Sequence, residues 1–147
     1  MYGLMLLLHI LGATVWTGGH LVLALTILPR VLRDRSPRVL LQFESMYERV
    51  GLPALLLQVA TGIWLAYRFL PAPTEWFDIG NAAARPIAAK LLLLAITVIF
   101  AIDARCRVIP KLSVHSLPSL AWHIVPVTVI AVLFVVVGVS FRTGWLY

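Results

Sequence analysis

The sequence predicts an all-α integral membrane protein, folded as a bundle of four transmembrane helices. Two properties of the whole chain indicate this class: 61% of its 147 residues are hydrophobic and 12% are charged, and its mean hydropathy is +0.97. A soluble domain of average composition is about half apolar and about a quarter charged. A chain this short cannot bury so large an excess of apolar side chains in its own interior. We therefore expect lipid to cover them, in a single domain over residues 1–147.

The first apolar run has no charged side chain before Arg30. About 20 apolar residues are needed to cross ~30 Å of hydrocarbon, so a helix over residues 4–28 is long enough. A cleavable signal peptide would have a basic leader, a shorter apolar run and small residues at its end. This run has no such leader and ends at Pro29-Arg30, so we expect a retained transmembrane helix.

Three further apolar runs predict the remaining helices, over about residues 50–70, 86–104 and 120–142. None of them alternates apolar and polar residues as a half-buried strand would. A helix satisfies its own backbone hydrogen bonds, which a membrane span requires because lipid offers no partners. The sequence thus predicts four helical spans and no strand.

The basic residues predict the orientation, because loops rich in Lys and Arg stay in the cytoplasm. Eight of them flank the first and third loops, and four lie toward the other side. We therefore expect both termini in the periplasm of a bacterial inner membrane, with the protein crossing it several times. The two groups are Arg30, Arg33, Arg35, Arg38, Arg49, Arg105, Arg107 and Lys111, against Arg68, Arg85, Lys90 and Arg142.

Composition also excludes some classes of function. The net charge of +6 does not indicate a nucleic-acid-binding protein, because the basic residues are few and flank apolar runs. One cysteine, Cys106, excludes an internal disulfide and a cysteine-based metal site. The three methionines, Met1, Met5 and Met46, form no Met-rich copper motif.

Two histidines lie in the first span, and a polar side chain at membrane depth is a candidate functional residue. His9 and His20 are 11 residues apart, which returns them to within ~20° of one helix face, ~16 Å apart along the axis. Gly12, Trp16 and Gly19 lie beside or between them. The small residues would let a flat cofactor approach the backbone, or would serve close helix packing.

Lys90 and His123 lie about one turn inside the third and fourth spans. Lys90 is either a ligand or a side chain that reaches out to water, and His123 either a ligand or an interfacial residue. The first and third helices enter the membrane from the same side, so His9 and Lys90 are expected at matched depth in the outer leaflet. By the same reasoning His20 and His123 share the inner leaflet.

Two nitrogen ligands from different helices at one depth suit the axial positions of a haem iron in a bundle core. We therefore expect an outer site of His9 with Lys90 and an inner metal or haem site of His20 with His123. A direct hydrogen bond between the two inner histidines is the alternative.

These residues, with their flanking segments, are similar to those of a known family. The chain resembles the copper-resistance protein D (CopD) family and its relative, the HemJ-type protoporphyrinogen oxidase, over nearly its whole length. The most specific pieces are the pattern of His9, Trp16 and Gly18, the Pro29-Arg30 helix exit, and Lys90 at the start of the third helix. The resemblance implies haem b associated with His9 and Lys90.

The chain also departs from the HemJ-type pattern. Those proteins generally follow the Pro-Arg exit with an aromatic-rich segment that bears a histidine, and this chain has Val31-Leu32-Arg33 there. Its Gly19-His20 and Trp122-His123 pairs resemble the CopD-like branch instead. The resemblance therefore favours copper handling over porphyrinogen oxidation.

The leading functional hypothesis is a b-type haem membrane redox protein, with one or two haems and an electron-transfer or oxidase role. Its partner would be a quinone, a porphyrinogen or a periplasmic copper protein. The alternative is a copper transport or resistance protein that binds copper through its intramembrane histidines, although Cu(I) prefers Cys and Met ligands. A packing or assembly subunit is the third hypothesis, and a homo-oligomer is left open.

Overall fold

The computed structural model describes residues 1–146, and all its regular elements are helical. Four helices are long and apolar enough to cross a membrane, so the prediction of a four-span helical membrane protein is confirmed, and no strand occurs in residues 1–146. The principal elements in chain order are α1 (Tyr2–Val22), a π-helical turn (Leu23–Ile27), α2 (Leu28–Asp34), α3 (Pro37–Phe69), α4 (Ala84–Asp103), a second π-helical turn (Ala104–Val108) and α5 (Leu117–Thr143).

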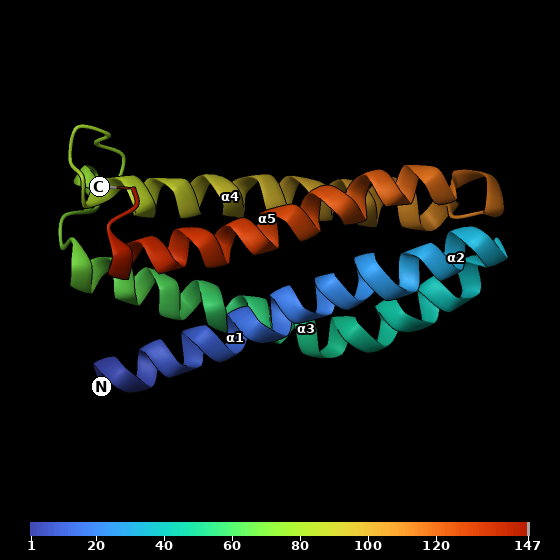
Figure 1. Ribbon diagram of the computed structural model, residues 1–147, viewed down its shortest axis with the longest axis horizontal. Helices are drawn as coiled ribbons and strands as arrows, with labels where there is room; N and C mark the ends of the chain where they lie inside the picture. The colour runs from blue at the N-terminus through green and yellow to red at the C-terminus, as the bar shows by residue number, and fades with distance from the viewer. Residues whose placement is uncertain (147) are drawn as a thin grey trace.

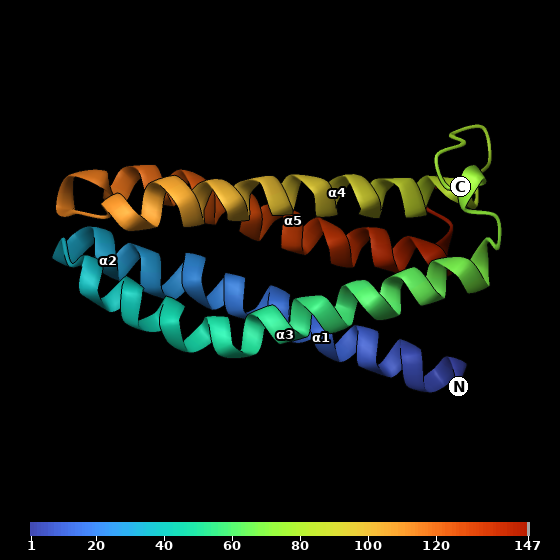
Figure 2. The same cartoon turned by 180° about the vertical axis from the view of Figure 1, so that it is seen from behind.

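The helices form two antiparallel pairs (Figures 1 and 2). One pair is α1 with α3, and the other is α4 with α5; α1 also packs against α5 and so joins the two pairs. Both ends of the chain lie at the same end of the bundle, together with the loop between α3 and α4 (Figure 1). We call this the terminal end, and the opposite end, where the other two connections lie, the loop end.

Three helices extend beyond their predicted bounds, and the third of the four passes residue 104 through its π-helical turn to Val108. The second membrane helix begins at Pro37 rather than near residue 50, because the polar stretch before the apolar run is also helical and extends it beyond the span. The first helix likewise continues past residue 28, through its π-helical turn, to Asp34. Apolar runs mark the part of a helix that lies in lipid, and they do not mark where the backbone stops being helical.

Both π-helical turns end two residues before a proline. The turn Leu23–Ile27 precedes Pro29, and the turn Ala104–Val108 precedes Pro110. A proline in a helix lacks its N–H and its ring crowds the carbonyl four residues earlier. A widened turn at that place lets the chain pass the proline without a break.

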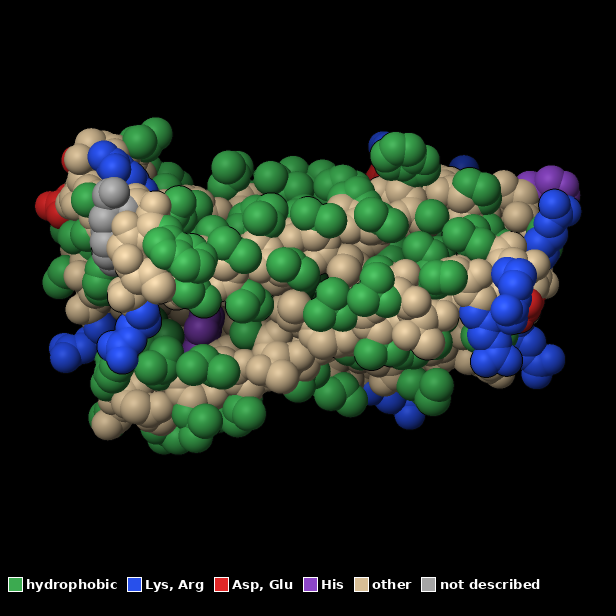
Figure 3. Space-filling model, viewed as in Figure 1, with side chains coloured by type: hydrophobic (Ala, Val, Ile, Leu, Met, Phe, Trp, Pro, Cys, Tyr) green, Lys and Arg blue, Asp and Glu red, His purple; other side chains and the backbone are tan. Residues whose placement is uncertain are grey.

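Apolar side chains cover the sides of the bundle, while Lys and Arg gather at its two ends (Figure 3). This distribution is that of a protein whose lateral surface faces lipid. The largest group of fully buried apolar residues is at the loop end, where α2, α3 and α5 converge. It consists of Leu28, Val31, Leu40, Val108, Leu117, Leu120 and Ile124.

The α1–α3 pair is close because glycine lies at the contact. A Cβ atom placed on Gly12 would lie 2.9 Å from the carbonyl oxygen of Ala54 and 3.2 Å from Cβ of Gln58. No real side-chain carbon sits that close to a backbone oxygen, so only glycine permits this separation of the two helices. Small residues at such contacts are the usual means of tight packing between membrane helices.

We expect Gly12→Ala to push α1 and α3 apart and to lower the free energy of unfolding by about 1–3 kcal/mol, the typical cost of overpacking. Gly18→Ala is the matched control in the same helix, because a Cβ there meets nothing within 4 Å. Denaturation of the purified protein in mixed detergent measures both. Equal stability of the two variants would show that the contact at Gly12 is not the close one described.

Candidate functional site

His9 is held against α3 by its Nδ1 atom. This atom lies 2.9 Å from the backbone oxygen of Gln58 and 3.1 Å from Oγ1 of Thr61. A carbonyl oxygen can only accept, so Nδ1 carries the proton and donates it. The neutral ring then has an unprotonated Nε2 with an available lone pair, and this atom has no hydrogen-bond partner in residues 1–146.

Two further contacts fix the His9 ring. The hydroxyl of Thr61 donates to the backbone oxygen of Leu57 at 2.6 Å, so its oxygen is free to accept from Nδ1 of His9. A Cβ placed on Gly62 would lie 3.0 Å from Cε1 of His9. The ring therefore lies against bare backbone of α3, and any larger residue at position 62 would displace it.

Lys90 lies on the face of α4 that packs into the bundle, together with the buried residues Pro86, Ile87 and Thr97. Its Nζ atom is 3.4 Å from the position of a Cβ on Gly138 and 5.3 Å from the ring centre of Phe141, both on α5. Nζ of Lys90 donates no hydrogen bond to an acceptor in the described part of the chain. The amine thus lies against α5, and the aromatic ring is its one favourable electrostatic contact.

The structure places His9 and Lys90 in the same half of the bundle, toward the terminal end. They project from α1 and α4, which belong to different helix pairs. Both α1 and α4 begin at the terminal end (Figure 1), so each residue lies about two helical turns from that end.

His20 is buried within α1 and its neighbours. Its Nδ1 lies 2.9 Å from the backbone oxygen of Trp16, and its ring packs at 4.3 Å from the Trp16 ring and 5.8 Å from the ring of Tyr47. Since the carbonyl accepts, Nδ1 carries the proton here too, and Nε2 is the unprotonated nitrogen. Two aromatic rings, of Trp16 and Tyr47, thus flank this histidine.

The ring of Tyr47 on α3 is the reason that two positions, 19 and 51, need glycine. Cβ atoms placed on Gly19 and Gly51 would overlap its ring, and its hydroxyl lies 3.0 Å from the backbone oxygen of Trp16 and 3.2 Å from that of Val15. For Gly12 and Gly19 the sequence left two interpretations open, room for a flat cofactor or close helix packing. In the structure α3 fills the space beside each of them, so they serve helix packing.

His123 has partners at both ring nitrogens. Nδ1 lies 2.9 Å from the backbone oxygen of Ser119, and Nε2 lies 2.7 Å from Oδ2 of Asp103, which also pairs with Arg107 at 3.2 Å. The contact with Asp103 therefore joins the start of α5 to the end of α4.

The predicted inner site paired His20 with His123. The structure gives each histidine a different partner: His20 faces Trp16 and Tyr47, whereas His123 binds Asp103. No hydrogen bond joins the two rings in the described residues, and both nitrogens of His123 are engaged. The sequence contained Asp103 but gave no signal that it would lie opposite His123, because the contact depends on how α4 and α5 pack.

A pocket of about 530 Å³ opens at the terminal end and is lined by Met1, Tyr2, Trp64 and Arg68. Sequence reasoning missed it, although spacing offered a signal. Tyr2 is seven residues before His9, and Arg68 is seven after Thr61, so each pair shares a helix face two turns apart. The pocket thus continues the α1–α3 seam beyond His9, although neither His9 nor Lys90 lines it.

Comparisons of this chain with protein-family models, with curated proteins and with solved structures find no significant match. The resemblance to the CopD and HemJ-type proteins therefore stays a prediction from the residues quoted above. In residues 1–146, moreover, no three His, Cys, Asp or Glu side chains group as a metal site would require.

We expect Tyr47→Phe to lower the free energy of unfolding by about 0.5–1.5 kcal/mol, because it removes the hydroxyl and keeps the ring. Tyr47→Ala should cost about 3–5 kcal/mol, since it empties the space between Gly19 and Gly51. Denaturation in mixed detergent measures both variants. If Tyr47→Ala were no worse than Tyr47→Phe, the ring would not be the element that fills this contact.

Proposed function

We propose that this chain is a b-type haem redox protein of the bacterial inner membrane, related to the CopD and HemJ-type group. In this proposal His9 and Lys90 hold one haem in the half of the bundle nearest the termini. Its role is electron transfer or oxidation linked to copper handling.

The hydrogen bond from His9 to the Gln58 carbonyl is the observation that carries the proposal. Histidines that bind metals typically donate the other ring N–H to a carbonyl or carboxylate, which fixes the tautomer and the ring direction. His9 has this arrangement: Nδ1 donates to Gln58 at 2.9 Å and Nε2 keeps its lone pair.

The surroundings of Lys90 fit a ligand role. An amine binds iron only after it loses its proton, and burial away from water favours that loss. Lys90 has no carboxylate partner in residues 1–146 to hold the charged form, and Gly138 leaves bare backbone beside its Nζ. The contact with the Phe141 ring favours the charged ammonium form of Lys90 and therefore opposes coordination. Binding of iron to the amine must compete with this contact.

Two further residues offer donors that suit the carboxylates of a haem. The indole Nε1 of Trp16 is a buried donor without a hydrogen-bond partner in residues 1–146, and such a group costs free energy unless an acceptor pairs with it. Arg68 in the pocket at the terminal end offers a guanidinium for carboxylates. A haem held by His9 and Lys90 would supply one-electron redox chemistry, and the residues around it would set its ligation, orientation and access to water.

The orientation with both termini in the periplasm belongs to the same proposal. It rests on the excess of Lys and Arg around the loop end, and it puts the His9–Lys90 site near the periplasmic face. That position suits exchange of electrons with a periplasmic copper protein, a quinone or a porphyrinogen. Association of copies of the chain is compatible with it, since apolar side chains cover the lateral surface.

We expect reporter fusions to place the C-terminal end in the periplasm and the segment Arg33 to Arg38 in the cytoplasm. An alkaline phosphatase fusion should be active at the first position, and a fluorescent protein that folds in the cytoplasm should be visible at the second. The reverse pattern would move the candidate haem site to the cytoplasmic half.

We expect the purified protein to show a Soret band and a reduced-minus-oxidised spectrum typical of haem b. His9→Ala should lose most of the bound haem, because it removes the nitrogen that α3 positions. Lys90→Met should keep part of the haem with a changed spin state or potential. His115→Ala is the control, since this histidine is exposed in a loop at the opposite end of the bundle.

Two results would contradict this assignment. If His9→Ala and Lys90→Met both left haem content and spectrum unchanged, the two residues would be structural. If the wild-type protein bound stoichiometric copper and no haem, the copper-transport alternative would replace the proposal.

A further inference from the structure

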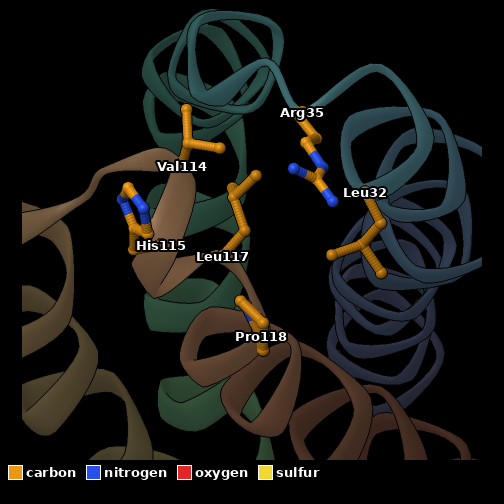
Figure 4. Close-up of a pocket in the computed structure, with 6 residues that line it drawn as sticks. All are labelled: Leu32, Arg35, Val114, His115, Leu117 and Pro118. Atoms are coloured by element: carbon orange, nitrogen blue, oxygen red, sulfur yellow. The ribbon is translucent and has the colours of Figure 1, made fainter.

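A second cavity, of about 350 Å³, lies at the loop end of the bundle, far from His9 and Lys90. Its walls come from two connections that are distant in sequence: Leu32 and Arg35 where α2 turns into α3, and four residues before and at the start of α5. These four are Val114, His115, Leu117 and Pro118. Figure 4 shows the Arg35 guanidinium reaching into the space between Leu32 and Leu117.

Arg35 has no anionic partner of its own. Its neighbours Arg30 and Arg33 both pair with Asp34, at 3.6 Å and 2.9 Å, so one carboxylate already serves two guanidiniums. The Arg35 guanidinium donates no hydrogen bond to an acceptor within residues 1–146. The cavity therefore contains a cation whose charge the protein leaves uncompensated, with His115 as a second nitrogen group on the facing wall.

The backbone at Arg35 is also unfavourable for an arginine. Its φ of 47° and ψ of 39° make it the only non-glycine residue with positive φ in residues 1–146. This left-handed position after a helix normally belongs to glycine or asparagine. A residue kept there against its conformational preference suggests that its side chain has a role.

From these three features we propose that the cavity binds the phosphate group of an anionic membrane lipid. The guanidinium meets the phosphate oxygens, while Leu32, Val114, Leu117 and Pro118 suit the glycerol and first methylene groups of the same molecule. A free phosphate ion would use the cation and leave the apolar walls in contact with water. The many basic residues at this end of the bundle would also concentrate anionic lipid around it.

The test compares lipid binding by native mass spectrometry of the protein released from detergent. Phosphatidylglycerol and phosphatidylcholine with the same acyl chains are the probes, and inorganic phosphate is the competitor. We expect wild-type protein to retain phosphatidylglycerol preferentially, and Arg35→Gln to retain it about tenfold less well, as loss of a charge-assisted hydrogen bond implies. Arg38→Gln is the control, because this substitution removes the same charge in the first turn of α3, three residues further along the chain, and Arg38 does not line the cavity.

Arg35→Gly separates binding from folding. Glycine relieves the left-handed backbone, so this variant should be at least as stable as wild type in neutral detergent and yet lose the lipid. Equal lipid retention by Arg35→Gln and Arg38→Gln would overturn the proposal. Displacement of the lipid by millimolar inorganic phosphate would also overturn it and identify a free-phosphate site instead.

Discussion

The close contact of α1 with α3 is the interaction on which the rest of the structure depends. It is possible because Gly12, Gly19 and Gly51 remove side chains where the helices meet. The contact brings a backbone carbonyl of α3 within hydrogen-bonding distance of His9. It also seats Tyr47 against the carbonyls that precede His20. Packing between these two helices thus sets the direction of both intramembrane histidines.

Lipid supplies no hydrogen bonds, so each polar side chain in a span has to find a partner inside the protein. Thr17 and Thr128 meet this requirement across the α1–α5 contact, by donating to the backbone oxygens of Ala131 and His20. His123 meets it through Asp103. Four polar atoms depart from this requirement, because no hydrogen bond to them is formed within residues 1–146: Nε2 of His9, Nζ of Lys90, Nε1 of Trp16 and Oε1 of Gln58.

The two ends of the bundle are built differently. The loop end has the apolar cluster of buried residues and a cross-link between α3 and the segment after α4, in which Arg105 and Glu48 pair at 2.9 Å. The terminal end has the edge-on packing of Phe69 against Phe141 and the pocket of about 530 Å³ lined in part by Trp64 and Arg68.

The sequence by itself determined the number of spans, their helical state and the residues worth testing. These follow from local properties: apolar runs of sufficient length, and the rarity of His and Lys at membrane depth. It could not determine that α3 begins at Pro37, because a polar stretch is compatible with either a helix or a loop.

Only the tertiary structure decided which groups meet. In the structure His123 pairs with Asp103, α3 fills the space beside Gly12 and Gly19, and Nδ1 of His9 donates to the backbone oxygen of Gln58. Each outcome depends on how far one helix is rotated and shifted against another. That rotation is fixed by packing summed over many weak contacts along whole helices, and no short pattern in the chain encodes it.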